Sequence, residues 1–405
     1  MLLSLCLSIS FALSAMDRRK EQFLSEPSYM ILPMPYSLPG IGEGIMLTGL
    51  AANIFDTNID LFGVAITGDA EGIIMGVDDF HLISETLFIE LMYQDLSKAM
   101  VQNYDVRGMD TKKDEFQYIE LSKVLSQSAK ATLSLFDRMF ELYARYFSQE
   151  IEITRIRTPE GDLIGEFSDP YKEKNEQYLY GFTLDYTDDH QDPRKGLRLT
   201  SESVSSPRQS NENPDYYVMN YQISAFIPLG ESSTWAFNLY ASDAVVRSEG
   251  DTDYDNIKAI VGLTCEPTDA ECLETEDQLI QRFIAARKYG TADSLGGDEL
   301  LRAYPQGRFQ AAHMYYYSTE LRWNFAQDVV PFNFWIWKDV ATGFQLAVFY
   351  EAGSVADLRE DLGKIVKTSQ GVGFRMVSAS GYVYRTDLAW GDEGMTTTIM
   401  FGYPW

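Results

Sequence analysis

The sequence has little of the material from which catalytic and metal sites are built. Among its 405 residues are three histidines and three cysteines. His81, His190 and His313 lie far apart in the chain, without the spacing of metal ligands. A G-x-S-x-G nucleophile motif, a phosphate-binding loop and a dinucleotide fingerprint are all missing. We therefore expect no enzymatic activity, no metal centre and no cofactor.

Long hydrophobic runs are also missing. No internal segment approaches the roughly 18 apolar residues that a membrane-spanning helix needs. The one long apolar run, residues 1–15, ends in small residues at 12–15 that suit a signal-peptidase site. Basic residues do not precede this run, whereas Arg18, Arg19 and Lys20 follow it. We expect residues 1–15 to be the signal peptide of an exported protein, with a membrane-anchored N-terminus as the alternative.

Basic residues are in deficit, with 33 Lys and Arg against 60 Asp and Glu and a net charge of −27. This balance excludes nucleic acid as a partner, because phosphate binding needs clustered Lys and Arg. The acidic surface fits solvated loops. Divalent cations held between such loops and an anionic lipid layer are the alternative.

Two of the cysteines share one acidic loop. Cys265 and Cys272 are seven positions apart, and in an exported protein we expect them to form a local disulfide. A zinc site would need further ligands, which the neighbouring sequence does not supply.

The dominant pattern along the chain has a period of two residues. In 215–228, Tyr217, Tyr221 and Ile223 belong to an apolar set that alternates with residues such as Asn220. This is the pattern of strands with lipid on one side and a polar lumen on the other. Many segments run to about ten residues or more, longer than the strands of a soluble β-sandwich, which also alternate.

The connections between these segments alternate in length. A tight turn at 228–231 contrasts with long hydrophilic loops at 157–176, 206–214 and 246–308. Outer-membrane barrels show this asymmetry, with long loops outside the cell. The sequence therefore predicts an all-β fold: a transmembrane antiparallel β-barrel of about sixteen strands in a bacterial outer membrane, with long extracellular loops, one of them folded into the lumen.

The expected domain boundaries follow from prolines and glycines. Four prolines between positions 27 and 39 predict that residues 16–43 form a short, irregular periplasmic segment. The barrel domain is then expected over 44–405, closed between a first strand near 44–54 and a last strand near 395–405. Glycines near that first strand weaken strand pairing and make this seam the weakest in the barrel; they are Gly42, Gly44 and Gly49.

The long loop 246–308 is expected to contain a helix. Thr275 and Gln278 form a capping box. Gly290 can end the helix. Four apolar residues, from Leu279 to Ile284, share one helical face. We expect a short helix packed on or in the barrel mouth, with a partner-binding helix as the alternative.

Charged residues occur on strand faces that the alternation assigns to the lumen. Charges in a partly desolvated lumen need partners. Arg302, at the end of the long loop, can bridge two carboxylates through bidentate hydrogen bonds. The alternative is that these groups line a wet pore. They are Glu320, Arg322, Glu351, Arg375, Arg385 and Asp387.

Short motifs in the last hundred residues resemble, in their order and spacing, the bacterial surface-antigen barrels of the BamA/TamA family of outer-membrane assembly factors. They are Leu301-Arg302-Ala303-Tyr304, Thr319-Glu320-Leu321-Arg322, Phe349-Tyr350-Glu351-Ala352-Gly353, Gly371-Val372-Gly373-Phe374-Arg375 and Tyr384-Arg385-Thr386-Asp387. The resemblance implies a sixteen-strand barrel whose sixth extracellular loop folds back inside. There Arg302 would meet Glu320 and Glu351.

The same resemblance implies that the chain end is a terminal strand signal read by assembly machinery, with Phe401, Tyr403 and Trp405 on one strand face. The sequence departs from the family in Ala303, which replaces a glycine, and in Glu351, which replaces an aspartate. Family members carry periplasmic POTRA domains before the barrel. Residues 16–43 are too few for one, so a barrel without POTRA domains is expected.

The function that the resemblance implies is insertion or export of outer-membrane proteins or lipids. Its partners would be outer-membrane lipid and assembly partners or substrate proteins in the periplasm or outer membrane. The alternative is a gated pore or structural barrel with a plugging loop and no assembly role.

Overall fold

The computed structural model describes residues 17–23, 27–104, 106–208, 213–261, 265–334, 337–378 and 383–405. The expected signal peptide, residues 1–15, lies outside these ranges. None of the helices within them is long and apolar enough to cross a membrane.

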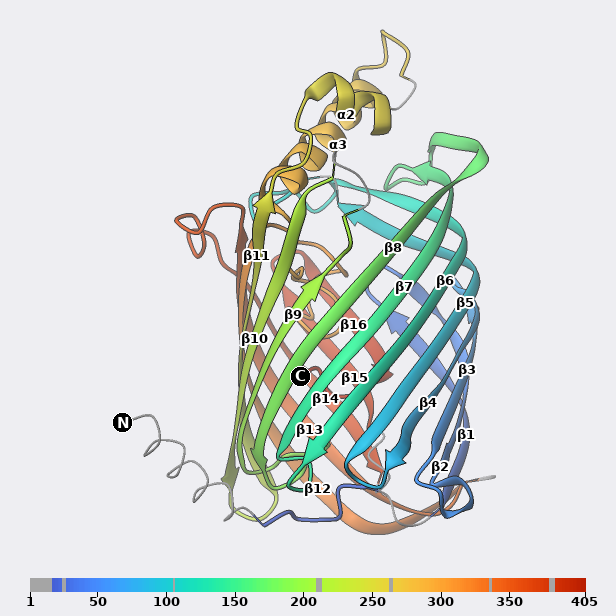
Figure 1. The fold of residues 1–405 in the computed structure, drawn as a ribbon, viewed down its shortest axis with the longest axis vertical. Coiled ribbons are helices and arrows are strands. Elements are labelled where there is room, and N and C mark those ends of the chain that lie inside the picture. Colours follow the sequence, from blue (N-terminus) through green and yellow to red (C-terminus); the bar gives the residue numbers. More distant parts are fainter. Residues whose placement is uncertain are drawn as a thin grey trace.

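Sixteen antiparallel strands follow one another around a closed barrel, with the last strand next to the first (Figure 1). The predicted fold class is therefore confirmed. The strands are β1 Ser28–Leu38, β2 Gly42–Ala52, β3 Asp60–Gly68, β4 Glu71–Ile83, β5 Leu87–Tyr104, β6 Phe116–Leu135, β7 Phe140–Arg157, β8 Leu163–Thr187, β9 Gly196–Ser205, β10 Asp215–Leu229, β11 Ser233–Ser248, β12 His313–Phe334, β13 Trp337–Ala356, β14 Lys367–Ser378, β15 Val383–Gly391 and β16 Gly394–Phe401.

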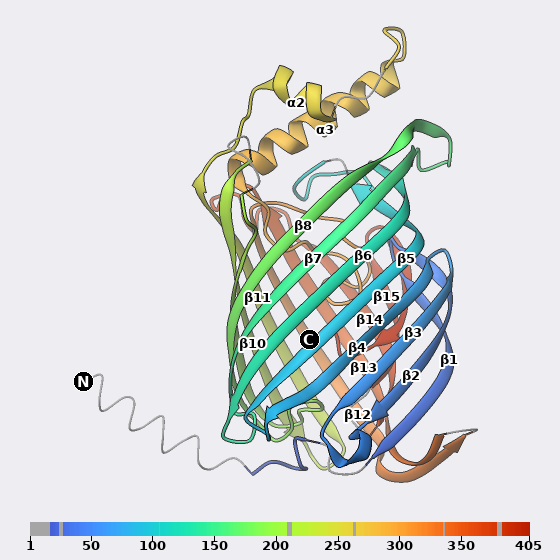
Figure 2. The ribbon, with the colours of Figure 1, turned by 45° about the vertical axis from the view of Figure 1, so that its right-hand side comes forward.

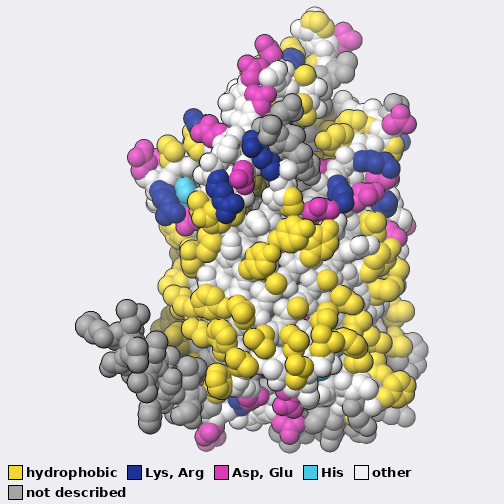
Figure 3. Space-filling model, in the orientation of Figure 1, with side chains coloured by type: hydrophobic (Ala, Val, Ile, Leu, Met, Phe, Trp, Pro, Cys, Tyr) yellow, Lys and Arg dark blue, Asp and Glu magenta, His cyan; other side chains and the backbone are white. Residues whose placement is uncertain are grey.

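Side chains alternate across the barrel wall as the period of two predicts. On β10, Tyr221 and Ile223 are exposed on the outer face, whereas Asn220 and Ser224 are buried inside. On the face shown in Figure 3, hydrophobic side chains form a broad band across the wall, and charged side chains gather toward the two ends. An apolar band of this kind is what a lipid-facing barrel wall requires.

The longest connections lie at one end of the barrel, together with short turns such as 69–70 and 392–393. One end, called here the short-turn end, carries tight turns such as 188–195 and 230–232, and the N-terminal residues 17–23 lie against it (Figure 1). The other, the long-loop end, carries the connection 249–312 with the helices α2 Tyr254–Val261 and α3 Ala270–Tyr289. Both helices stand above the barrel wall (Figure 2).

Helix α3 is longer than the sequence predicts. It begins five residues before Thr275, and Asp269 caps it by accepting a hydrogen bond from the backbone N of Cys272 (3.1 Å). The expected capping box at Thr275 and Gln278 is therefore wrong, because both residues lie inside the helix. Gly290 ends it as predicted. The Cys265–Cys272 disulfide is present at the start of the helix.

The first strand is not where the prolines placed it. β1 runs through Pro33 and Pro35 and pairs with β2 from Ser28↔Ala52 to Leu38↔Gly42, so the barrel begins before residue 44. A proline is tolerated where a strand needs no backbone donor on one side. Within the described residues, β1 is in register with β16 only at Ser37↔Ile399.

The three glycines that were expected to weaken the seam lie in β2, away from it. β2 is paired along its length with β1 and over most of it with β3. Gly44 serves close packing, since a Cβ there would collide with the backbone oxygen of Thr67. The expectation of a poorly paired seam holds, but β1 and its prolines form it.

Candidate functional site

The connection between α3 and β12 folds back into the barrel. Leu295 and Phe309 pair as an antiparallel bridge, and Gly296 lies at a positive φ where a Cβ would collide with the backbone. This closes 295–309 into a compact inward turn. Leu301 and Tyr304 at its tip are fully buried.

Arg302 is bound by three carboxylates. Its Nε donates to Glu351 Oε1 (2.7 Å), its Nη1 to Asp387 Oδ2 (2.7 Å) and its Nη2 to Glu320 Oε2 (3.3 Å). Its backbone N also donates to Glu351 Oε2 (2.8 Å). The guanidinium carbon lies 3.4 Å from the ring centroid of Phe349. The structure thus brings together the three residues named from the sequence and adds Asp387 as a third acceptor.

The surrounding arginines join the same network. Arg322 Nε donates to Glu320 Oε1 (2.6 Å), Arg375 Nη2 to Glu320 Oε2 (2.7 Å) and Arg385 Nη1 to Asp387 Oδ2 (3.2 Å). All of these side chains are essentially inaccessible to solvent. We call this network the lumen lock: Arg302, Glu320, Arg322, Glu351, Arg375, Arg385 and Asp387.

The charges of the lumen lock nearly cancel. Four arginines face three carboxylates, and Asp298 supplies a fourth, with its Oδ2 3.4 Å from Arg385 Nη2. Buried ions are tolerated only when they are paired and hydrogen-bonded. The lock therefore holds a loop to four strands, β12 to β15, through contacts that bulk water does not reach.

Backbone and hydroxyl contacts fix the loop tip further. Thr396 Oγ1 donates to the backbone O of Arg302 (2.5 Å), and the Tyr304 hydroxyl donates to the backbone O of Thr368 (3.2 Å). Ala303 lies against Gly391, where a Cβ would come within 2.9 Å of the alanine Cβ. Gly391 thus leaves room for the methyl group of Ala303.

The strand face expected to carry the terminal signal ends at Phe401, so Tyr403 and Trp405 do not lie on it. β16 ends there, and Gly402, at φ 89°, turns the chain into the lumen. Tyr403 and Trp405 stack on the Arg322 guanidinium, with ring centroids 4.5 and 4.9 Å from its carbon. Gly402, directly after Phe401, is the available signal for this break, because positive φ interrupts strand alternation.

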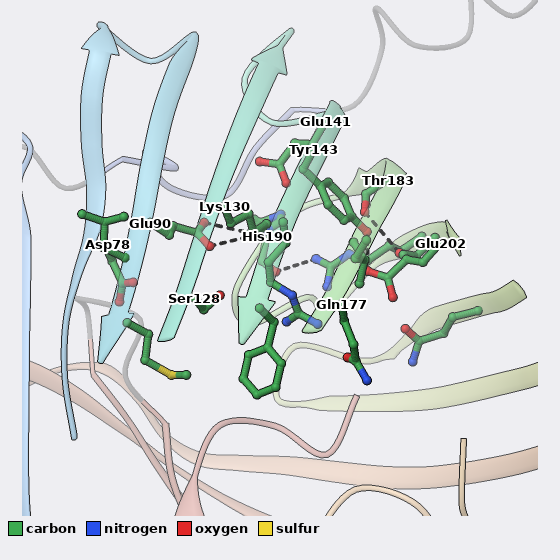
Figure 4. Close-up of a pocket in the computed structure, with 18 of the residues that line it drawn as sticks. Asp78, Glu90, Ser128, Lys130, Glu141, Tyr143, Gln177, Thr183, His190 and Glu202 are labelled. Atoms are coloured by element: carbon green, nitrogen blue, oxygen red, sulfur yellow. Dashed lines mark hydrogen bonds and ion pairs between the residues drawn. The ribbon is translucent and has the colours of Figure 1, made fainter. Parts of the chain in front are cut away.

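A cavity of about 670 Å³ lies against the wall from β3 to β10, and Figure 4 shows its polar side chains. Lys130 lies 3.0 Å from Glu90, and the Tyr143 hydroxyl donates to Glu202 Oε1 (2.8 Å). Asp78 also lines it. Its lining comes from β3 to β10 and the 188–195 turn, whereas the tip of the inward loop contacts β12 to β16.

The three histidines remain apart. His190 lies on the 188–195 turn, 2.9 Å from Asp185, and His313 Nδ1 lies 2.8 Å from Asp243 Oδ1. His81 stacks on Phe88. Among the residues that the structure describes, no group of His, Cys, Asp and Glu is arranged to hold a metal.

No protein-family model and no curated protein matches the chain. Solved structures do. CdiB from Escherichia coli is 12% identical, with 94% of this chain and 68% of that one covered and a TM-score of 0.51. BamA from Haemophilus ducreyi lacking POTRA domains 1–3 is 12% identical over 97% of this chain and 77% of that one (TM-score 0.47). CdiB from Acinetobacter baumannii is 10% identical over 93% and 59% (TM-score 0.49). The likeness to the Escherichia coli protein is one of fold.

Proposed function

We propose that this protein is an outer-membrane barrel that inserts or exports polypeptides or lipids, with the joint between β1 and β16 as its working element. The observation that carries the proposal is the contrast between this joint and its neighbours. β1 and β16 are in register only at Ser37↔Ile399 within the described chain, whereas β15 and β16 pair from Tyr384↔Phe401 to Gly391↔Gly394. This is also the function that the sequence resemblance implies.

The composition of the joint supports a seam that opens. Pro33 and Pro35 cannot donate backbone hydrogen bonds, and the inward turn at Gly402 ends β16 early. A strand edge with unpaired N–H and C=O groups is a template for pairing with a strand of another chain. An incoming polypeptide can therefore add to β1 or β16 at little cost in native pairing.

The lumen lock contacts β16, the strand on one side of this seam. Thr396 on β16 donates to the backbone of Arg302, and Asp387 on β15 binds its guanidinium. The lock thus holds β15 and β16 from inside the barrel, whereas β1, on the other side of the seam, is weakly paired with β16. In this proposal the lock keeps the rest of the barrel rigid when the seam parts.

Reconstitution tests the proposal directly. Liposomes containing the purified protein are expected to speed the membrane folding of a urea-unfolded outer-membrane protein, followed by its protease protection. Liposomes containing an unrelated barrel at the same density are the control. Equal folding rates in the two preparations would count against an assembly role.

A gated pore is the second candidate, because a polar cavity lies beside the inward loop. Under this hypothesis Arg302→Ala, which frees the loop tip, raises single-channel conductance in planar bilayers and leaves outer-membrane assembly in cells unchanged. Arg302→Lys, which keeps the charge, is the matched variant and is expected to raise it less. Conductance that is unaltered by either substitution would remove the pore as a candidate.

A further inference from the structure

The N-terminal residues 17–23, called here the mouth segment, lie against the short-turn end of the barrel (Figure 1). They contact the β6–β7 turn and the β8–β9 turn, more than a hundred positions away in sequence. One backbone hydrogen bond is among these contacts, from Arg19 N to Asp188 O (2.6 Å). Most of the other contacts are made by the side chains of the segment. Its binding therefore depends on which residues it contains.

Carboxylates surround the three basic residues of the mouth segment. Arg18 Nη1 lies 3.6 Å from Asp185, and Arg19 Nη2 lies 3.1 Å from Asp189 and 3.0 Å from Asp192. Lys20 Nζ lies 3.2 Å from Asp189. We call this surface the acidic cradle: Asp137, Asp185, Asp188, Asp189 and Asp192.

An aromatic pocket adjoins the acidic cradle. The Phe23 ring lies 5.1 Å from the His81 ring and 6.0 Å from the Phe88 ring, both edge-to-face. The guanidinium carbon of Arg138 lies 5.3 Å from the same ring. The three consecutive basic residues thus bind carboxylates of the acidic cradle, and the aromatic residue three positions later packs against His81 and Phe88.

Asp189 is the carboxylate of the cradle that binds two cations of the mouth segment. Its side chain is 1% exposed, and its Oδ1 accepts from the backbone N of Gln191 and of Asp192. In the described residues, the ion pairs of its Oδ2 come from Arg19 and Lys20. If the mouth segment leaves, Asp189 Oδ2 loses both ion pairs, and water or another cation takes their place.

The other basic groups of the turn do not take over this role. Arg194 pairs with Asp192 and Arg198 with Asp185. Burial lowers the pKa of the His190 imidazole, and the nearby Arg138 lowers it further. An emptied cradle would therefore carry excess negative charge.

We propose that the acidic cradle is a peptide-binding site, occupied in the isolated chain by the mouth segment, which a second polypeptide with consecutive basic residues followed by an aromatic residue replaces. The proposal is independent of assembly activity, because binding alone defines it. Asp192 also accepts from the Tyr403 hydroxyl (2.7 Å), and Tyr403 stacks on Arg322 of the lumen lock. Replacing the bound segment would thus act on the lumen lock through Asp192 and Tyr403.

The test measures binding of a fluorescent peptide of residues 17–23 to the full chain in detergent, by anisotropy. In the receptor variant, Arg18, Arg19, Lys20 and Phe23 are all changed to serine, which empties the cradle. We expect this variant to bind the peptide at least about tenfold more tightly than the wild type, because a tethered segment competes at an effective concentration near the millimolar range.

Two further variants, made in the emptied receptor, separate a specific site from general charge attraction. Asp189→Asn is expected to weaken binding about tenfold, whereas Asp110→Asn, at an exposed loop of the opposite end, is expected to leave it unchanged. Circular dichroism confirms that each variant is folded. Equal peptide affinity of wild type and emptied receptor, or equal effects of the two asparagine variants, would overturn the proposal.

Discussion

Replacing Arg302 by alanine is expected to lower the free energy of unfolding by about 3–5 kcal/mol, the cost of removing one partner from a buried charge network. The substitution leaves Glu351, Asp387 and Glu320 with one fewer cation, and all three side chains are inaccessible to solvent. It also removes the stacking on Phe349. Urea unfolding in lipid vesicles, followed by tryptophan fluorescence, measures the loss.

Two variants make this result interpretable. Arg302→Lys keeps the charge but not the planar fork that reaches three carboxylates, so we expect an intermediate loss. Arg155→Ala removes an arginine that pairs with Glu166 on the exposed surface and is expected to change stability little. A loss for Arg302→Ala as small as that for Arg155→Ala would mean that the lock does not stabilise the barrel.

Much of the fold was predictable because lipid and lumen impose opposite chemistry on alternate residues. On β10 the alternation assigned Tyr221 and Ile223 to the outer face, and the structure agrees. The first strand was missed because proline was treated as if it lay in a central strand. Pro33 and Pro35 instead lie beside the seam, where the rule against proline is weakest.

The lumen lock was predictable in part. Alternation placed Glu320, Glu351 and Asp387 on inner faces, and the resemblance paired the first two with Arg302. Which inner-face charges actually meet depends on the register between neighbouring strands. Asp387 lies opposite Gly373, whose missing side chain leaves space for the carboxylate. Sequence periodicity carries no information on such a register.

The two ends of the chain were the least predictable part. The basic residues after the expected signal peptide and the aromatic residues at the C-terminus each had a plausible local explanation. In the structure both meet at Asp192, which accepts from Arg19 and from Tyr403. A contact made by three segments this far apart in sequence leaves no local pattern.

Locking the seam is expected to abolish assembly activity if the proposed function is right. Ser37 and Ile399 are directly opposite on β1 and β16, and such partners lie about 4.5–5.5 Å apart between Cα atoms, within disulfide range. The double variant Ser37→Cys/Ile399→Cys should therefore close on oxidation. We expect it to lose the folding acceleration measured in liposomes when oxidised and to recover it when reduced.

The matched control places the same bond in a joint that does not need to open. Ile31 and Gly49 are opposite one another on β1 and β2, and Ile31→Cys/Gly49→Cys should remain active in both redox states. Activity of the oxidised seam variant equal to that of this control would exclude seam opening as the mechanism.

Conductance adds a second readout, because a pore through the lumen should not depend on the seam. Loss of assembly with unchanged conductance would therefore separate the two candidate functions within one variant.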